Sequence, residues 1–451
     1  MNPEALPTDA ERYPTLTDAG RRMLAFLREH PAAPVYRNHS GNRLLAPEVA
    51  AARQFEERIA HAAVGWAPGT VPAWVAPFVA DTFRRVPYYR ALGRPPADLV
   101  QLPTICRADL ARDVTPFVPD DVDVTRLLNF RTTGTTGNPL QVPSHPLVAA
   151  RYLAYHKRAL RRVGIELRHG AGQVGVILLG HQRRCFTYVS VTPTMGESGL
   201  AKLNLHPDDW RHPDDRARYL DAMAPEVISG DPISFAELLK VPMTWRPRAL
   251  LSVSMLLLPG LRRQLEQRFG CPVLDIYSLN EVGPVGVFDG AAGGHLLLQP
   301  ELFVELLDSA GQPVGAGERG EVTVTGGFNF CLPLLRYRTG DFAALSFGPD
   351  GPVLRELSGR APVRYRRADG GWVNNIDVTH ALQALPLAHF AVHQAADSEV
   401  TLRLDANGQQ WAAEARTALA RLLGALPVQV ALLQHEDKTV QYTSALPEAL
   451  T

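Results

Sequence analysis

The chain has 451 residues, of which 46% are hydrophobic, and its 46 basic and 46 acidic side chains give a formal net charge of zero. This length and composition can bury a large core, divided into two or three domains. Balanced charge provides no positive field for nucleic acid or an anionic membrane, so neither is an expected partner. No apolar run approaches the roughly 20 residues that cross a bilayer, and the N-terminus lacks a signal peptide, so a cytoplasmic location is expected.

The cysteines and lysines narrow the chemistry further. The four cysteines are scattered without CxxC spacing, which argues against a zinc site and against a disulfide framework. All but four of the basic residues are arginine. Because lysine is so rare in this chain, each lysine is a candidate for a specific role. The four lysines are Lys157, Lys202, Lys240 and Lys438.

Residues 1–125 are expected to be mainly helical. Apolar residues recur at spacings of three and four in 16–30 and in 46–63, which is typical of amphipathic helices. We interpret this segment as the helical N-terminal part of a large domain.

Beyond residue 126, short apolar runs alternate with helical patterns. Asp231 is expected to cap one helix, and Gly270 is expected to close another. Alternating strands and helices indicate a largely parallel sheet, whose ligand sites lie at the carboxyl ends of its strands. The predicted strands are 173–180, 225–230 and 271–278, and the predicted helices are 231–240 and 261–270.

After Gly290 the pattern becomes all-β, with hairpin strands predicted at 302–308 and 321–327. The last 90 or so residues show strand, helix and strand signals, which suit a small α+β lid domain. The expected fold is therefore α/β, with a large N-terminal domain of mostly parallel sheets and a β subdomain. Its expected segments are 1–125, a nucleotide- and acid-binding core at 126–358 with the β subdomain, and a C-terminal lid at 359–451.

The stretch RTTGTTGNP at 131–139 predicts a phosphate-binding loop. Glycines free the backbone to adopt left-handed conformations, so that N–H groups and threonine hydroxyls can surround phosphate oxygens. Asn138 stands where a Walker loop requires lysine, so this is not an ordinary P-loop. A plain turn is the alternative. The candidate ligands are Thr132, Thr133, Gly134, Thr135, Thr136 and Gly137.

Two other segments add groups that suit a nucleotide. Tyr277 and Glu281 are expected in the loop after strand 271–278, where a ring could stack on a base and a carboxylate could bind Mg²⁺. Asp341 is expected in a turn behind Arg336 and Arg338, where its carboxylate could accept both ribose hydroxyls. The alternatives are a strand-end tyrosine with a solvated glutamate, and a surface salt bridge.

Taken in order, the segments TTGTTGNP, IYSLNE, RYRTGD and SGR resemble the adenylate-forming enzymes, specifically the phenylacetate-CoA ligase branch. RRVPYYRALG and LPTICRADL before the loop, and the segment 295–326, resemble the same branch. The resemblance extends from about residue 80 to about residue 380 and carries more weight than any one motif.

The resemblance implies a role for each motif. The 132–139 loop would hold the β- and γ-phosphates of ATP, with Thr136 among the catalytic groups. Tyr277 would pack on adenine, with Ser278 and Asn280 beside it in the nucleotide site. Glu281 would ligate Mg²⁺, and Asp341 would hold the ribose diol.

Two cations near the C-terminus complete the implied site. Arg360 would reach the ribose or a phosphate beside a hinge to the lid. Lys438 would enter with the lid to stabilise the transition state, although Asp437 replaces the usual preceding glycine. The alternative for Lys438 is a solvated lysine in the tail.

The chain departs from the family pattern at two places. Pro362 and Val363 stand where an acidic hinge residue is usual, and proline would stiffen a lid rotation. The segment after strand 173–180 is not glycine-rich and brings His181, Arg183 and Tyr188 toward the expected acyl pocket, where an arginine could pair a second anionic group. The alternative is that such arginines are surface residues.

These features predict an AMP-forming acid ligase that uses ATP and Mg²⁺ to activate a small acid, with an aromatic one favoured. Transfer to CoA as a thioester is the usual next step in this branch. The stiffened hinge favours a rival that adenylates without CoA and passes the acid to an amine or a carrier protein, or that activates an oxyanion such as nitrite, in natural-product biosynthesis. A nucleotide-binding protein without turnover is the other alternative. The sequence leaves the oligomeric state open, with a homodimer as one option.

Overall fold

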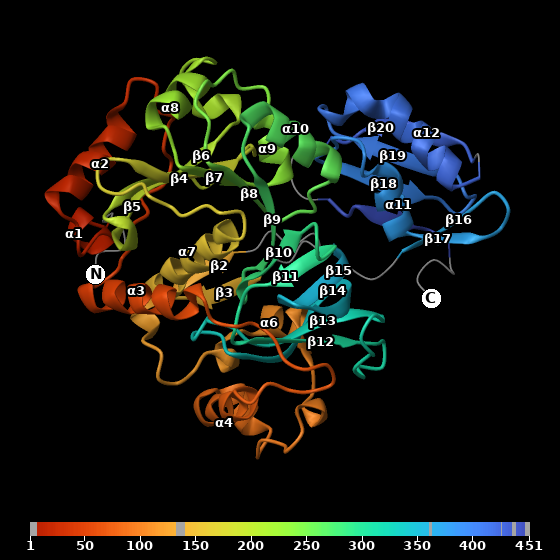
Figure 1. The fold of residues 1–451 in the computed structure, drawn as a ribbon, viewed down its shortest axis with the longest axis horizontal. Helices are drawn as coiled ribbons and strands as arrows, with labels where there is room; N and C mark the ends of the chain where they lie inside the picture. Colours follow the sequence, from red (N-terminus) through yellow and green to blue (C-terminus); the bar gives the residue numbers. More distant parts are fainter. Residues whose placement is uncertain (1–6, 132–139, 360–362, 425, 435–438, 447–451) are drawn as a thin grey trace. The chain divides into compact units, whose positions relative to one another are not determined.

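The computed structural model describes residues 7–131, 140–359, 363–424, 426–434 and 439–446 (Figure 1). The chain divides into two compact units. Unit 1 comprises Met1–Val49, Val163–Asp275 and Pro362–Thr451, and unit 2 comprises Ala50–Arg162 and Ile276–Ala361. The boundaries of these two units differ from those of the three expected segments. The three segments therefore stay a prediction. Within the described ranges, no helix has both the length and the apolar character to cross a membrane.

Unit 1 contains a mostly parallel sheet, as the alternating pattern predicts. Its strand order is β8-β7-β4-β6-β5. The pairs β7/β8, β4/β7 and β4/β6 are parallel, whereas β5/β6 is antiparallel. The strands are β4 (Val174–Gly180), β5 (Tyr188–Thr192), β6 (Ser198–Asn204), β7 (Val227–Gly230) and β8 (Ala249–Val253).

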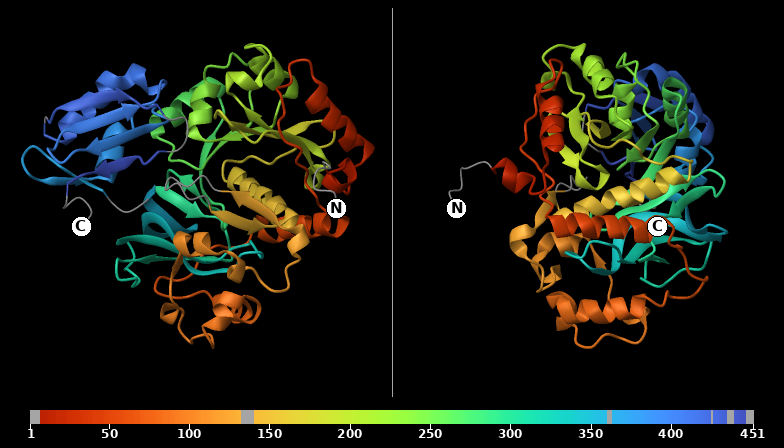
Figure 2. Two further views of the ribbon diagram at one scale, coloured as in Figure 1. Left: turned by 180° about the vertical axis from the view of Figure 1, so that it is seen from behind. Right: turned by 60° about the vertical axis from the view of Figure 1, so that its left-hand side comes forward.

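Helices of unit 1 bury their apolar faces against this sheet. Helix α2 packs on β5 and β6 and is the red helix beside the yellow-green strands in Figure 2. One buried cluster joins Leu27 of α2, Tyr219 of α8, Phe235 of α9 and Leu265 of α10 to the strand side chains. The helices are α1 (Asp9–Arg12), α2 (Asp18–Glu29), α8 (Asp215–Met223), α9 (Pro232–Leu238) and α10 (Pro259–Phe269), with the 3-10 helices η4 (Pro193–Met195) and η5 (Pro207–Asp209).

The predicted helix ends are confirmed. Asp231 caps α9, because its carboxylate accepts a hydrogen bond from the backbone N–H of Ser234 at 2.7 Å. Gly270 ends α10 in the left-handed region with a φ of 67°, where a side chain would strain the backbone.

The residues from 363 onward form a smaller α+β domain, blue in Figure 1, with its own buried cluster. A four-stranded sheet of order β20-β19-β18-β21 packs with α11 and α12. The elements are β16 (Arg364–Arg366), β17 (Trp372–Asn374), α11 (Asn375–Leu382), β18 (Phe390–Gln394), β19 (Val400–Leu404), η6 (Gly408–Trp411), α12 (Ala412–Leu422), β20 (Val428–Leu432) and β21 (Tyr442–Ser444).

Unit 2 is built on antiparallel strands in the order β12-β13-β14-β15-β11-β10, with β1 parallel to β14. Strand β9 (Val273–Leu279) contributes its last four residues to unit 2, where they pair with β10. The other strands are β1 (Ile105–Cys106), β2 (Leu128–Arg131), β3 (Gln141–Ser144), β10 (Gly283–Asp289), β11 (Gly294–Leu297), β12 (Leu302–Leu307), β13 (Arg319–Gly326), β14 (Leu334–Gly348) and β15 (Gly351–Gly359).

Helices α4 and α5 contribute buried side chains to the core of unit 2. The helices of this unit are α3 (Ala46–Ala60), α4 (Val75–Arg85), α5 (Pro87–Ala91), α6 (Arg107–Arg112) and α7 (Pro146–Arg161), with η1 (Leu99–Gln101), η2 (Thr115–Phe117) and η3 (Val124–Arg126).

Two local predictions in unit 2 are wrong. Tyr277 lies within β9 instead of the following loop, because β10 pairs with it across Gly286. Asp341 lies within β14 instead of a turn. The register between β13 and β14 shifts there, so that Glu321 pairs with Phe342 while Thr323 pairs with Arg338. The turn-like residues, including Gly340 with a φ of 80°, form a bulge inside one long strand.

Candidate nucleotide-binding site

The β9–β10 hairpin of unit 2 carries Glu281 in its turn. Gly283 begins β10 with a φ of 77°, and a Cβ there would lie 2.4 Å from the ring of Phe328, so this position accepts only glycine. The buried amide of Gln299 donates to the carbonyls of Val282 and Pro284 at 2.7 and 2.8 Å. These contacts hold the turn in one conformation.

The Glu281 carboxylate is buried, with 5% of the residue exposed. The Tyr337 hydroxyl on β14 donates to Glu281 Oε1 at 2.8 Å, and Arg107 Nη1 at the start of α6 lies 4.0 Å from the same oxygen. Burial and the adjacent Glu281 charge raise the pKa of Tyr337 well above its ordinary value. The hydroxyl therefore stays protonated and remains a donor to the carboxylate.

Asn329 adds a third support for this turn. Its Nδ2 donates to the Glu281 carbonyl at 3.3 Å and to the Pro143 carbonyl at 3.0 Å, and its Oδ1 accepts from the Cys331 N–H at 3.2 Å. Pro143 lies in β3, directly after the predicted phosphate loop. Asn329 thus links the Glu281 turn to the strand that follows this loop.

Tyr277 and Asp341 meet across the sheet. The Tyr277 hydroxyl donates to Asp341 Oδ2 at 2.7 Å, and burial together with the Asp341 charge raises the pKa of Tyr277 well above its ordinary value. The Asp341 backbone N–H donates to Thr339 Oγ1 at 3.1 Å within the bulge of β14. The bulge thus turns the Asp341 side chain toward β9.

The other two predicted residues of this segment lie on the same hairpin. Ser278 of β9 pairs with Pro284 of β10, and the Asn280 carbonyl accepts a hydrogen bond from the Tyr152 hydroxyl of α7 at 3.2 Å. The structure therefore gathers Tyr277, Ser278, Asn280 and Glu281 on one hairpin, and Asp341 of β14 contacts this hairpin through Tyr277. Their assignment to a nucleotide stays a prediction.

The remaining predicted nucleotide and catalytic groups lie outside the described residues. They are Thr132, Thr133, Gly134, Thr135, Thr136, Gly137, Arg360 and Lys438. The strands that flank the 132–139 loop, β2 and β3, pair with Arg131 opposite Gln141. Strands β2 and β3 are therefore antiparallel neighbours.

Tyr337, Arg107 and Asn329 are additional residues of the site that the sequence interpretation missed. Tyr337 belongs to the RYRTGD segment, so its position in a recognised motif was an available signal. Arg107 and Asn329 reach Glu281 from distant parts of the chain, and no local pattern marks them.

Arg336 and Arg338 serve the sheet. Arg336 is buried with a φ of 47°. It pairs with Glu305 at 2.9 Å and donates to the carbonyls of Val100 and Leu102 at 2.7 and 2.9 Å. Arg338 pairs with Glu321 of β13. Glu305 belongs to β12 and Glu321 to β13, so these ion pairs tie β14 to the two preceding strands of the sheet.

The three predicted acyl-pocket residues belong to unit 1. His181 follows β4 and its ring centroid lies 5.8 Å from that of His206. Arg183 is exposed. Tyr188 lies in β5, where burial raises its pKa to about 12. Because β6 separates β4 from β5, the sheet does not make His181 and Tyr188 neighbours, and their role as an acyl pocket stays a prediction.

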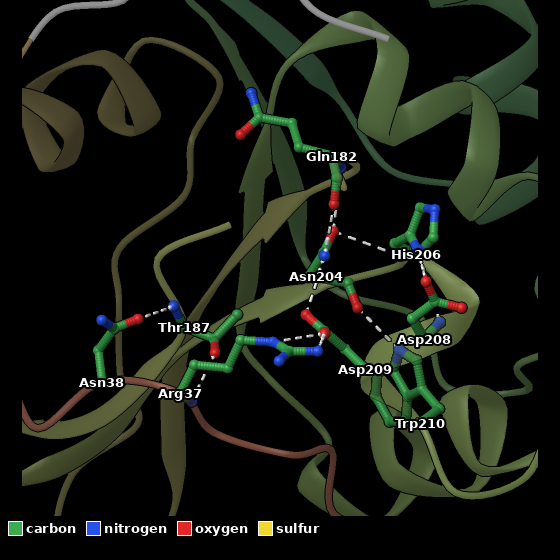
Figure 3. A network of polar contacts seen from close by, with 9 residues as sticks. All are labelled: Arg37, Asn38, Gln182, Thr187, Asn204, His206, Asp208, Asp209 and Trp210. Carbon is green, nitrogen blue, oxygen red and sulfur yellow. Dashed lines mark hydrogen bonds and ion pairs between the residues drawn. The ribbon is translucent and has the colours of Figure 1, made fainter. Parts of the chain in front are cut away.

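A polar network occupies the ends of β4 and β6 beside His181 (Figure 3). The Asn204 amide donates to the Gln182 carbonyl at 2.7 Å and to Asp209 Oδ2 at 2.9 Å. Its Oδ1 accepts from the N–H groups of Gln182 and His206 at 3.1 and 3.3 Å. Arg37 Nε donates to Asp209 Oδ1 at 2.8 Å. The network fixes the two loops that leave the carboxyl ends of these strands.

The described residues contain no cluster of three or more His, Cys, Asp or Glu side chains suited to a metal ion. A magnesium ion that is bound mainly by substrate phosphates and water needs only one or two protein carboxylates. Glu281 provides one such carboxylate, so its surroundings fit that mode of binding.

Comparison with known proteins shows which sequences the chain resembles. No family model matches the chain. The chain is 34% identical over 107 residues to a phenylacetate-coenzyme A ligase of Pseudomonas putida, covering 22% of this chain and 24% of the relative. It is 27% identical over 305 residues to that of Thermus thermophilus, covering 60% and 63%. The match thus spans less than two thirds of each relative.

Solved structures share the fold. A 2-hydroxyisobutyryl-CoA ligase in the postadenylation state, with 2-HIB-AMP bound, matches with a TM-score of 0.58 and 16% identity, covering 97% of this chain and 94% of that one. An open conformation of that ligase with 2-HIB-AMP and CoA matches with a TM-score of 0.51, covering 92% and 99%. The chain is thus similar in sequence to phenylacetate-coenzyme A ligases and shares its fold with the 2-hydroxyisobutyryl-CoA ligase.

Proposed function

We propose that the chain is an AMP-forming acid ligase. It would activate a carboxylic acid with ATP as an acyl-AMP, release pyrophosphate and transfer the acyl group to CoA as a thioester. The observation that carries this proposal is that two motif carboxylates, Glu281 and Asp341, accept hydrogen bonds from tyrosine hydroxyls where the β9–β10 hairpin contacts β14. The sequence relationship to phenylacetate-CoA ligases supports a small acid, with an aromatic acid favoured.

The reaction explains why charges gather at this hairpin. A carboxylate oxygen attacks the α-phosphorus of ATP in line with the departing pyrophosphate, and both reactants are anionic. The site must therefore supply positive charge before they can meet. A magnesium ion would neutralise phosphate charge when bound at Glu281, whose carboxylate Tyr337 orients.

The other motif residues would hold the nucleotide. Asp341 would accept the ribose hydroxyls, since its carboxylate already accepts the Tyr277 hydroxyl in the free protein. Tyr277 would border adenine. By the family resemblance, Thr136, Arg360 and Lys438 would contact phosphates during the reaction.

The test is product analysis with a broad panel of acids, ATP, Mg²⁺ and CoA. The proposal predicts equimolar AMP and pyrophosphate with at least one acid. Formation of ADP and phosphate without pyrophosphate would exclude this reaction class.

A second candidate is adenylation without CoA, and Val363 favours it. The family resemblance implies an acidic hinge residue at this position. Val363 is instead apolar and is buried in the core of the C-terminal domain. Its N–H donates to Asn375 Oδ1 at 3.2 Å, and its carbonyl accepts from the Asn375 N–H at 2.9 Å. Because Val363 is packed and hydrogen-bonded directly after Pro362, this side of the hinge is restrained.

The acceptor in this second candidate would be an amine or a carrier-protein thiol, or the substrate would be an oxyanion such as nitrite. Mass spectrometry of products made with and without CoA separates the two candidates. The second predicts the same rate of acid consumption in both reactions. A CoA thioester formed at ordinary turnover rates would exclude it.

A further inference from the structure

A cavity of about 140 Å³ lies within unit 2, and among the described residues assigned above to the nucleotide site only the supporting Asn329 lines it. Side chains of α3, α4 and α7 and the segment 327–333 line it. Phe55 and Phe78 supply aromatic surface, and Arg58, Arg85 and Arg151 supply positive charge. A cavity whose lining combines aromatic rings with cations is suited to a small organic anion.

Two of the three arginines are already paired. Arg58 Nη1 lies 2.8 Å from Glu301 Oε1. Arg85 contacts Asp81 at 3.2 Å and Asp121 at 2.9 Å. With Asp81 and Glu301 as the carboxylates of the lining, the cavity wall carries one net positive charge, and Arg151 is the cation that remains.

Arg151 is held rigidly but incompletely satisfied. Its Cζ lies 4.6 Å from the ring centroid of Phe55 and 5.6 Å from that of Phe330, so the guanidinium is fixed by cation–π contacts. Nη1 makes one long hydrogen bond of 3.5 Å to the Phe328 carbonyl. Within the part of the chain that the structure describes, the buried Nε has no hydrogen-bond partner. A buried guanidinium with unused donors favours an acceptor ligand.

We infer that this cavity binds a small aromatic carboxylate, with the carboxylate on Arg151 and the ring against Phe78 and Phe328. A guanidinium fork matches a carboxylate in geometry and charge. The size fits one ring, since a cavity of about 150 Å³ accommodates benzene. A nucleotide or CoA is too large. Burial lowers the pKa of Arg151, and a bound anion would offset this cost.

The test uses 4-fluorobenzoate as the probe, observed by fluorine NMR with the full chain and without nucleotide. Wild type should bind it, and the neutral isostere 4-fluorobenzamide should bind at least tenfold more weakly. Arg151→Met should weaken 4-fluorobenzoate binding at least tenfold. Arg53→Met, an exposed arginine of α3 outside the cavity, is the matched control and should bind as wild type does.

A second variant keeps the test decisive if Arg151→Met folds poorly. Phe78→Trp adds volume to the lining of the cavity and should also weaken binding at least tenfold while Tm stays near that of wild type. Binding that survives both substitutions, or no binding by wild type at millimolar probe, would overturn the inference. Because ATP is absent, these outcomes do not depend on the proposed ligase activity, which pyrophosphate release tests separately.

Discussion

Two polar clusters among the described residues differ in which groups their hydrogen bonds reach. In unit 1, Asn204 uses both its amide donor and its carbonyl acceptor on the backbone of Gln182 and His206 as well as on Asp209. In unit 2, Tyr277 and Tyr337 donate to the carboxylates of Asp341 and Glu281. The Asn204 cluster holds loops in place, whereas the tyrosine hydroxyls orient the two charged carboxylates. We therefore expect the first to govern stability and the second to govern activity.

The largest effect is expected for Glu281→Gln. The amide keeps the size of the side chain but removes the charge that would hold magnesium, so pyrophosphate formation should fall by about 10²–10³-fold, of the order seen when a transition-state contact is removed. Steady-state pyrophosphate release with the best acid measures this. Activity within threefold of wild type would show that Glu281 does not serve the reaction.

Asn204→Ala should act on stability. It leaves several buried partners at the ends of β4 and β6 unsatisfied, so the free energy of unfolding should fall by about 3 kcal/mol. Urea denaturation measures the change. Pyrophosphate release assayed well below the Tm should change little, and a selective loss of kcat with unchanged stability would contradict the assignment of this cluster to structure.

A half-buried carboxylate, Asp405, sharpens the comparison through pH. Its Oδ1 accepts the Gly408 N–H at 2.7 Å, and burial raises its pKa from 3.8 to about 6. As pH rises, the unfolded chain therefore loses the Asp405 proton before the folded chain does. The contribution of Asp405 to the free energy of unfolding declines as pH rises from about 4 to about 6, then levels off.

Asp405→Asn keeps a side-chain oxygen that can accept the Gly408 N–H, and it removes the loss of stability with rising pH. The stability of the variant relative to wild type should rise by about 2 kcal/mol between pH 4 and pH 6.5, as measured by denaturation at both pH values. Asp397→Asn, which replaces an exposed carboxylate that accepts the Glu399 N–H at 3.0 Å, is the control and should show no such trend. An equal trend in both variants would exclude Asp405 as its source.

The smallest effect is expected for Tyr337→Phe, which removes the hydroxyl on Glu281 but keeps the ring. Loss of a group that orients a metal-binding carboxylate should weaken Mg²⁺-dependent activity about tenfold, seen as a higher Mg²⁺ requirement. Tyr365→Phe removes a comparable buried hydroxyl, 3.2 Å from the Val392 carbonyl, and should leave that requirement unchanged. If both variants behave alike, Tyr337 has no special role.

Local sequence patterns predicted helices and strands well where a single local signal, such as a helix cap, defines the element. The cap at Asp231 and the stop at Gly270 follow from local chemistry alone. Asp341 was misplaced because RTGD has the composition of a turn, while pairing with β13 and β15 stabilises it as a bulge within a strand. Motif order identified Tyr277, Glu281 and Asp341 together, but Arg107 and Asn329 reach the site through tertiary contacts that no local pattern encodes.

The most direct measurement is a crystal structure with a non-hydrolysable ATP analogue and Mn²⁺, in which the anomalous signal of Mn²⁺ locates the metal. We predict that Mn²⁺ lies within coordination distance of a Glu281 carboxylate oxygen and that the ribose hydroxyls contact Asp341. Nucleotide and metal bound away from both carboxylates would contradict the account.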